Sequence, residues 1–311
     1  MTRHLLADDD LTPAEQTEVL DLAERLRADP YALRPLAGPR SVAVIFDKPT
    51  LRSQTSFSAG IAELGGSVMM VDGRLAGIGL RESVADVARV LGRQASAIVW
   101  RTFAQSDLAL LAAYAGVPVI NALTDAYHPC QILADLQTLR QHGRTLPGLT
   151  LAYVGDGANN MAASYAVGGA VAGLHVRIGA PEGFHPEPAV LERSRALAAT
   201  TGGSVTVTDS AAEAVAGADA VATDTWVSMG QETDGLDRAA LFAPYAVTEA
   251  LLARADADAL FLHCLPAYRG REVAEAVLEG PQSVVWDEAE NRRHAQKAVL
   301  AFLLERSEVA R

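Results

Sequence analysis

Short runs of apolar residues alternate with helical stretches in two successive series, and this alternation most limits how the chain can fold. It predicts βαβ units and therefore parallel sheets. Gly143 and the Pro147-Gly148 pair interrupt the chain between the two series. We expect an α/β fold with two domains, each a mainly parallel sheet flanked by helices. The apolar runs lie at 42–46, 97–100 and 117–120 in the first series, and at 149–154, 174–178, 204–207, 220–222 and 259–262 in the second.

Capping signals mark a helix near each end of the chain. Thr12-Pro13-Ala14-Glu15 combines an N-cap, a proline at the first helical position and a glutamate three residues after the cap. Asp287, with Glu290 three residues later, is the predicted cap of the last helix, which is expected to cross back to the first domain. We place the first domain at 1–142, completed by 288–311, and the second at 148–287.

Composition restricts the partners of the chain. Its 311 residues are 50% hydrophobic and carry a formal net charge of −12, which argues against the basic surface that nucleic-acid binding needs. Two cysteines are too few for a disulfide framework, which indicates a reducing compartment. No apolar run approaches the length of a membrane span. We expect a cytoplasmic protein in which a local arginine cluster attracts any anionic substrate.

A candidate anion site follows the first apolar run. Between Phe46 and Phe57 a strand is expected to end and a helix to begin. Free backbone N–H groups at a helix start attract an anion, and Thr50, Arg52 and Ser53 add donors. Taken alone, the segment also fits a simple N-cap beside a surface arginine.

Two further polar segments follow strands of the first series. Arg101 comes directly after the run 97–100, where it can reach an anion or a carbonyl, although a solitary arginine is more often a solvated charge. In His128-Pro129-Cys130-Gln131 the proline fits a first helical turn. His128 and Gln131 could then face one small ligand. Taken singly, His128 also fits a cap or a core residue.

Two loops of the second series could hold an amino acid. Val154-Gly155-Asp156-Gly157-Ala158-Asn159-Asn160 is an incomplete dinucleotide turn, because Asn160 replaces the third glycine and no acid follows the next strand. A nicotinamide-dependent oxidoreductase is therefore disfavoured. In the segment 223–230, Asp224 could bind an amino group and Ser228 a carboxylate, or the segment could be a plain acidic loop.

His263-Cys264-Leu265-Pro266 ends the last apolar run, and ligands bind at the carboxyl ends of parallel strands. If the strand continues through Cys264, His263 points to the opposite face of the sheet. His128 and Cys130 are the other two potential metal ligands of this kind, but the spacing of the four matches no common zinc pattern. We therefore expect no metal.

Together, these segments resemble the aspartate/ornithine carbamoyltransferase family over nearly the whole chain. The resemblance is most specific at 128–131, 224–230 and 263–266, and the last two segments are similar to the ornithine branch. It implies transfer of the carbamoyl group of carbamoyl phosphate to the δ-amine of L-ornithine, giving L-citrulline and phosphate in arginine biosynthesis. It also implies a homotrimer, or a multiple of it, with no metal or organic cofactor.

The resemblance also implies roles for individual residues. Arg101 and His128 would polarise the carbamoyl oxygen, where negative charge develops as the amine attacks. Cys264 and Asp224 are both candidates for accepting the amine's proton, because a free alkylamine has a pKa of about 10. The residues that would bind carbamoyl phosphate are Thr50, Leu51, Arg52, Ser53, Arg101, His128, Gln131, Cys264, Leu265 and Arg292. Those that would bind ornithine are Asn160, Asp224, Ser228 and Met229.

Three positions depart from the family pattern, and one of them is Tyr268, which stands where histidine is common. Gln54 stands where a second arginine is usual, and Gly77 stands where members often place a glutamine that reaches the neighbouring subunit. One alternative is a paralogue that carbamoylates another amine, such as putrescine or an acylated ornithine. Another is a non-catalytic subunit or toxin-resistance homologue. The intact segment from Asp224 to Met229 argues against the paralogue.

Overall fold

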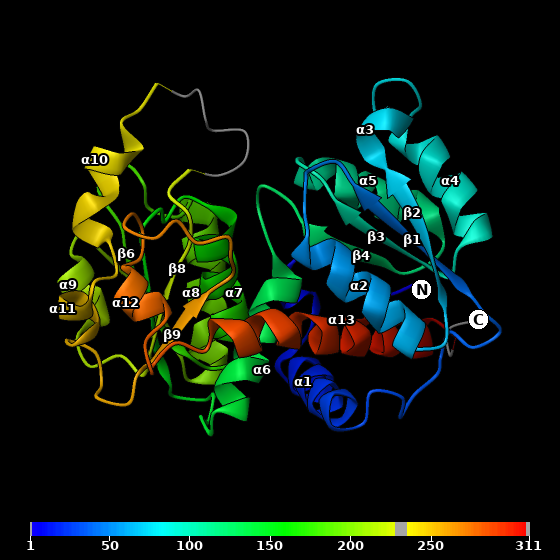
Figure 1. Cartoon of the computed structure of the whole chain (residues 1–311). Helices are drawn as coiled ribbons and strands as arrows, with labels where there is room; N and C mark the ends of the chain where they lie inside the picture. The colour runs from blue at the N-terminus through cyan, green and yellow to red at the C-terminus, as the bar shows by residue number, and fades with distance from the viewer. Residues whose placement is uncertain (1, 228–234, 309–311) are drawn as a thin grey trace. The chain divides into compact units, whose positions relative to one another are not determined.

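A computed structural model describes residues 2–227 and 235–308, so Ser228 and Met229 lie outside the described residues. The chain forms two compact units, Met1–Gln137 with Glu290–Arg311, and Thr138–Ala289. Each unit contains one parallel sheet flanked by helices (Figure 1), which confirms the predicted fold class. Within the described ranges, no helix is long and apolar enough to cross a bilayer.

The sheet of the first unit has four strands that pair in parallel in the order β2-β1-β3-β4. The strands are β1 (Ser41–Phe46), β2 (Ser67–Asp72), β3 (Ala97–Arg101) and β4 (Val119–Leu123). The sequence analysis did not predict β2, an edge strand with partly exposed side chains and two central methionines, which are good helix formers. After β2 the chain returns past β1 and forms β3 on the other side of β1. The order of the strands in the sheet therefore reverses between β1 and β3.

Helices cover both faces of this sheet. On one face, α4 (Val84–Gln94) and α5 (Gln105–Ala115) bury apolar side chains against β1 and β3. On the other lie α1 (Pro13–Ala28), α2 (Arg52–Glu63) and α13 (Val285–Glu308) (Figure 1). Lys297 of α13 donates to the Leu26 carbonyl of α1 at 3.1 Å, and a Cβ at Gly60 of α2 would lie only 2.9 Å from Lys297 Cγ. The C-terminal helix therefore packs on the first unit, as predicted, although Asp287 lies in its first turn rather than capping it.

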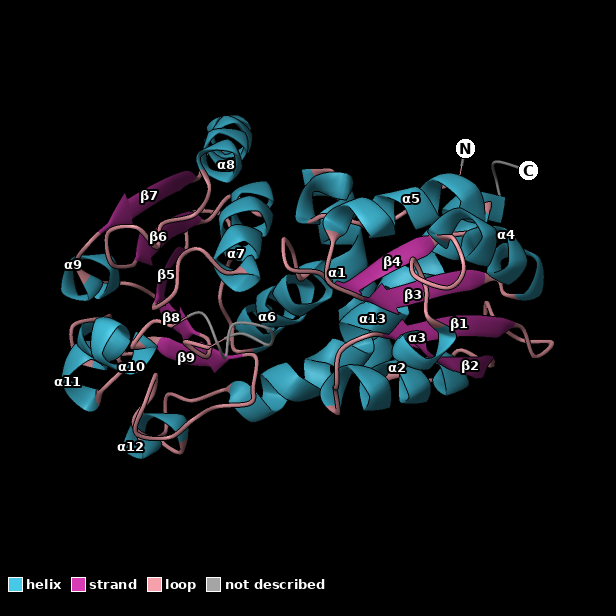
Figure 2. Ribbon diagram, turned by 90° about the horizontal axis from the view of Figure 1, so that it is seen from above, coloured by secondary structure: helices cyan, strands magenta, loops and turns pink. Residues whose placement is uncertain are grey.

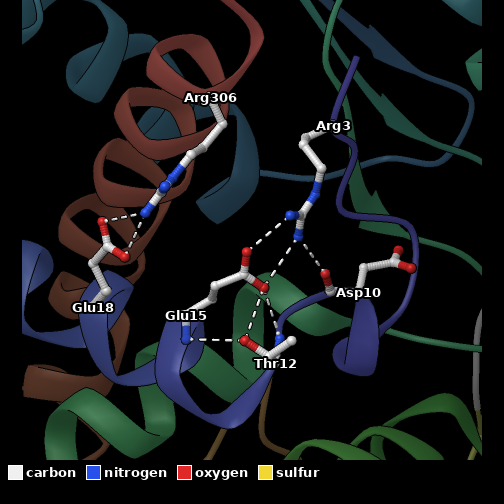
Figure 3. A network of polar contacts seen from close by, with 6 residues as sticks. All are labelled: Arg3, Asp10, Thr12, Glu15, Glu18 and Arg306. Carbon is white, nitrogen blue, oxygen red and sulfur yellow. Dashed lines mark hydrogen bonds and ion pairs between the residues drawn. The ribbon is translucent and has the colours of Figure 1, made fainter. Parts of the chain in front are cut away.

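Polar contacts attach the N-terminal segment to α1 and α1 to α13 (Figure 3). Thr12 and Glu15 form the predicted capping box. Arg3 donates to Glu15 at 2.8 Å, and this bond is the main reason why the pKa of Glu15 falls to about 2. Arg306 of α13 donates to both carboxylate oxygens of Glu18, at 2.8 and 3.1 Å.

The second unit has a five-stranded parallel sheet in the order β7-β6-β5-β8-β9 (Figure 2). All five strands coincide with predicted apolar runs. Helices α7 (Asn160–Val171) and α8 (Pro188–Thr201) pack together and against β6 and β7. Short helices α9 (Ala211–Val215), α11 (Glu249–Leu252) and α12 (Glu275–Leu278) share a core with β5, β8 and β9. The strands are β5 (Thr150–Val154), β6 (His175–Gly179), β7 (Ser204–Thr208), β8 (Ala220–Thr223) and β9 (Leu260–His263).

Each sheet therefore has a position where the strand order reverses. The reversal lies between β1 and β3 in the first unit and between β5 and β8 in the second. Ligands of open parallel sheets bind outside the carboxyl ends of strands at such positions. The segments that follow these four strands contain most of the candidate residues.

Candidate active site

Basic and polar side chains gather at the carboxyl edge of the first sheet, and we call them the cationic cluster. The loop after β1 and the start of α2 supply five members of the cluster, β3 ends at Arg101, and His128 directly precedes α6 (Pro129–Gln141). Arg292 comes from α13, far away in the sequence. The cluster consists of Lys48, Thr50, Leu51, Arg52, Ser53, Arg101, His128, Gln131 and Arg292.

The loop after β1 has the predicted strand–turn–helix form. The hydroxyl of Thr50 accepts a hydrogen bond from the Ser53 N–H at 3.3 Å, and Leu51 is the N-cap of α2. The Leu51 side chain is 70% exposed, so only its backbone can serve a ligand at the helix start. This arrangement places the start of α2 and the side chain of Arg52 at the carboxyl end of β1, which suits an anion.

Arg292 and Gln131 fix one another inside the first unit. Arg292 donates to Gln131 Oε1 at 2.5 Å and to the hydroxyl of buried Ser53 at 2.6 Å. Gln131 in turn donates through Nε2 to Asp135 at 2.8 Å. The orientation of the Gln131 amide is therefore set by its neighbours before any ligand arrives.

His128 lies buried among the cations of the cluster. Its carbonyl accepts from the Gln131 N–H at 2.9 Å, which places it at the start of α6, as predicted. Burial lowers the pKa of His128 well below its usual value, and the positive charges of Arg292 and Arg101 lower this pKa further. The imidazole is therefore neutral near pH 7, and it can donate a hydrogen bond to an oxygen without carrying a charge.

Lys48 belongs to the cluster but was missed by the sequence analysis. Its side chain is buried, forms an ion pair with Asp125, and has its Nζ 4.5 Å from the centre of the Phe103 ring. Its charge also lowers the pKa of His128. The signal that could have revealed it is its place two residues after a buried strand, next to Pro49.

A second group of side chains lies at the carboxyl edge of the second sheet, and we call Asn160, Asp224, Cys264 and Leu265 the acidic cluster. Asp224 directly follows β8, and Cys264 directly follows β9. The Cys264 thiol donates to Asp224 Oδ1 at 3.3 Å, and the Thr225 N–H donates to the same oxygen at 2.7 Å. Burial raises the pKa of Asp224, and the nearby His263 opposes that rise. A buried carboxylate with a raised pKa is suited to accept a proton.

The turn after β5 places Asn160 at the same edge of the sheet, because β5 pairs with β8. Asn160 is the first residue of α7, and Asn159 caps that helix by accepting from the Ala162 N–H at 2.9 Å. Within the second unit, Asn160, Asp224 and Cys264 therefore follow three strands at the same edge of one sheet, and a hydrogen bond joins Asp224 to Cys264.

β9 ends at His263, so the condition that the strand continues through Cys264 is not met. The Nδ1 of His263 accepts from the Leu265 N–H at 2.9 Å, and its Nε2 lies 3.3 Å from Glu272 Oε1. Among the described residues, the potential metal-ligand atoms of Asp224, His263 and Cys264 lie within 4.8 Å of one another. Both ring nitrogens of His263 already have partners, so this histidine supports the loop rather than offering a ready metal ligand.

In the comparison with known proteins, two family models match successive parts of the chain. The family model for the aspartate/ornithine carbamoyltransferase carbamoyl-P binding domain matches residues 3–141, and the model for the Asp/Orn binding domain matches residues 147–303. The chain is 58% identical to an ornithine carbamoyltransferase of Rhodococcus jostii, over 98% of this chain and 96% of the relative. It is 57% identical to one of Mycobacterium ulcerans, over 98% of this chain and 99% of the relative.

Solved structures are similarly close. Ornithine carbamoyltransferase from Pyrococcus furiosus superposes with a TM-score of 0.93 at 40% identity, covering 98% of this chain and 97% of that one. Anabolic ornithine carbamoyltransferase from Campylobacter jejuni superposes with a TM-score of 0.93 at 33% identity, covering 98% and 99%. The chain is therefore an enzyme of the aspartate/ornithine carbamoyltransferase family.

Proposed function

We propose that the enzyme transfers the carbamoyl group of carbamoyl phosphate to the δ-amine of L-ornithine, giving L-citrulline and phosphate. The observation that carries this proposal is the pair formed by Asp224 and the Cys264 thiol, 3.3 Å apart at the carboxyl edge of the second sheet. A buried carboxylate attracts an ammonium group and can accept its proton. The names of the relatives supply the identity of the amine.

Carbamoyl phosphate is assigned to the domain 1–142, completed by 288–311. The start of α2 and Arg52 would bind the phosphate, while Arg101 and neutral His128 would donate to the carbamoyl oxygen. Donors already aimed at an oxygen that gains charge are usually the largest catalytic contribution. The assigned residues are Thr50, Leu51, Arg52, Ser53, Arg101, His128, Gln131 and Arg292, with Cys264 and Leu265 from the other domain.

Ornithine is assigned to the domain 148–287, with Asn160, Asp224, Ser228 and Met229 as its binding residues. The neutral δ-amine attacks the carbamoyl carbon, so that a C–N bond forms, the C–O bond to phosphorus breaks, and one proton leaves the nitrogen. Asp224 or Cys264 accepts that proton. The reaction needs only proton transfer and charge stabilisation, so the proposal includes neither a metal nor an organic cofactor.

The proposal extends to assembly and location. Met70, Leu75 and Leu80 are exposed apolar side chains on β2 and the segment after it, with Leu80 96% exposed. Exposed apolar patches commonly mark interaction sites, and we assign these side chains to the interface of a homotrimer. Both cysteines are free thiols, which supports a reducing, cytoplasmic location for a step of arginine biosynthesis.

The test is an assay of phosphate release and ureido product with ornithine, putrescine and N-acetylornithine as acceptors. We expect release that depends on ornithine and is matched by citrulline. Faster turnover of putrescine or N-acetylornithine would instead identify a paralogue with another amine. Release without any acceptor would contradict the mechanism.

A further inference from the structure

Arg238 connects the two segments that carry the acidic cluster. It is the first residue of α10 (Arg238–Phe242), and it is buried in the second unit. Its Nη1 lies 3.0 Å from Asp156 Oδ2, in the turn after β5, and 3.0 Å from the Trp226 carbonyl, in the segment after β8. The Arg238 guanidinium therefore contacts both the turn after β5 and the segment after β8, the two segments at the point where the strand order reverses.

Each of the two segments leads directly to a candidate binding residue. Asp156 also accepts from the Ala158 N–H at 3.0 Å, which shapes the turn that ends at Asn160. Trp226 stands two residues after Asp224 and two residues before Ser228. A shift of the guanidinium would therefore move the backbone on both sides of an amino-acid ligand.

Aromatic side chains surround the guanidinium and keep it in place. Arg238 lies 5.6 Å from the centre of the Phe184 ring. Phe242 packs edge-on against Phe184 at 5.1 Å and stacks on Trp226 at 6.1 Å. The Arg238–Asp156 pair is almost fully buried, with side-chain exposures of 8% and 2%. Removing one member of such a pair leaves the other charge buried without its partner, so the neighbouring backbone is expected to rearrange.

We propose that Arg238 is a positioning residue for the amino-acid substrate, acting through Asp156 and the Trp226 carbonyl without touching the substrate itself. This inference rests on the proposed function, because it assigns the amino acid to the second unit. It predicts that disturbing Arg238 weakens binding of ornithine and leaves binding of carbamoyl phosphate, assigned to the first unit, almost unchanged.

The experiment compares Arg238→Met and Arg238→Lys with the unaltered full-length enzyme. Small displacements of binding groups commonly cost up to about 100-fold. For Arg238→Met we expect KM for ornithine to rise about 10- to 100-fold, while KM for carbamoyl phosphate changes less than about twofold. For Arg238→Lys, KM for ornithine should lie between the values for Arg238→Met and the unaltered enzyme, because lysine keeps the charge but loses the planar set of donors. Asp156→Asn should reproduce the ornithine effect.

A binding measurement separates this inference from the proposed reaction. L-norvaline has the amino-acid portion of ornithine but no δ-amine, so calorimetric titration in the presence of carbamoyl phosphate measures binding without turnover. The norvaline dissociation constant should rise as KM for ornithine does. If the unaltered enzyme binds norvaline but makes no citrulline, the proposed function fails while the comparison of variants still tests Arg238.

Arg306→Met is the matched control, because Arg306 also joins a carboxylate, Glu18, and lies over an aromatic ring, Phe302 at 5.1 Å. It should leave both KM values unchanged. Equal changes in the two KM values of Arg238→Met, or unaltered norvaline binding, would overturn the inference. If Arg238→Met does not fold, as judged by circular dichroism, Arg238→Lys and Asp156→Asn decide by the same criteria.

Discussion

The two sheets use the same topological position for opposite electrostatic purposes. Near the reversal between β1 and β3, burial of His128 lowers its pKa, the charges of Arg292 and Arg101 lower this pKa further, and the imidazole is neutral near pH 7. At the reversal between β5 and β8, a buried carboxylate, Asp224, has a raised pKa and is hydrogen-bonded to the Cys264 thiol. One edge is therefore equipped to bind an anion and the other to accept a proton. The fold therefore determines where the functional residues lie, at the carboxyl ends of the strands. The identity of the residues that follow each strand determines which chemistry is possible there.

The largest expected effect comes from removing Asp224, one of the two proposed proton acceptors of the second unit. Asp224→Asn keeps the shape of the side chain but removes its negative charge. Loss of a general base typically costs about 10²- to 10⁴-fold, so we expect kcat to fall within that range. Equilibrium binding of carbamoyl phosphate alone should be unaffected. A variant that retains nearly full kcat would transfer the role to Cys264, and Cys264→Ala would then be the variant to measure.

The corresponding change in the first unit is Arg292→Met. Arg292 donates to both Gln131 and Ser53, so its loss leaves two buried acceptors without that donor. Truncating one member of a buried charged contact costs about 2–5 kcal/mol. We therefore expect KM for carbamoyl phosphate to rise by roughly 30-fold or more, measured by initial rates at saturating ornithine. Arg292→Lys, which retains the positive charge but loses the planar set of donors, is the matched variant and should lose less.

The contrast can be sharpened through the pH dependence of stability. The folded pKa of His128 lies below that of the unfolded chain, so the unfolded state takes up a proton first as pH falls below about 6.5, and stability is lost. The folded pKa of Asp224 lies above its unfolded value, so the folded state binds that proton more tightly and stability is gained as pH falls through the raised pKa. The two edges therefore contribute with opposite signs.

Denaturant unfolding at several pH values measures both contributions. As pH falls below 6.5, the free energy of unfolding of His128→Asn should increase relative to that of the unaltered enzyme. For Asp224→Asn, the free energy of unfolding should instead decrease relative to that of the unaltered enzyme as pH falls toward 4. Drift of both variants in the same direction would show that the two edges do not differ as described.

The smallest expected effect concerns Gln54. Its side chain is exposed on α2, so an arginine there would add a positive charge near the helix start in a highly screened position. Exposed charge pairs contribute about 0.2–1 kcal/mol. Gln54→Arg should therefore lower KM for carbamoyl phosphate by at most about fivefold, an effect that fades at high salt. A larger gain would mean that Gln54 lies closer to the bound phosphate.

Replacing Gly77 by the glutamine that family members often have here is expected to cost stability. Gly77 ends α3 (Gly73–Ala76) in the left-handed conformation, with φ 65°, and a Cβ there would lie 3.0 Å from Arg81 Cβ. Glycine adopts this conformation without the steric cost that other residues bear. The glycine therefore has a structural use here, whatever contact a longer side chain would make.

The sequence predicted best what depends on local signals. Pro129 fixed the start of α6 and hence the place of His128, and the capping residues of α1 were recognised from Thr12 and Glu15. Asp224 was found because it follows an apolar run that becomes β8. These features follow from the order of neighbouring residues, which a sequence displays directly.

What the sequence could not supply depends on contacts between distant residues. The burial of Lys48 and its pairing with Asp125, 77 positions away, follow from how β1 and β4 meet the same edge. Arg238 was not among the predicted site residues, because its partner Asp156 lies 82 positions earlier. Cys130 could have been reactive, but burial raises the pKa of its thiol to about 12. Such side chains acquire their roles only when the sheet brings them together.

In the proposed reaction, carbamoyl phosphate assigned to the cationic cluster gives its carbamoyl group to an amine assigned to the acidic cluster. Nuclear magnetic resonance with carbamoyl phosphate labelled with ¹³C at its carbon tests this claim most directly. We predict that the label moves into the ureido carbon of citrulline, with one phosphate released for each citrulline, and only when ornithine is present. Label that stays in carbamoyl phosphate, or that appears as bicarbonate or cyanate regardless of ornithine, would contradict it.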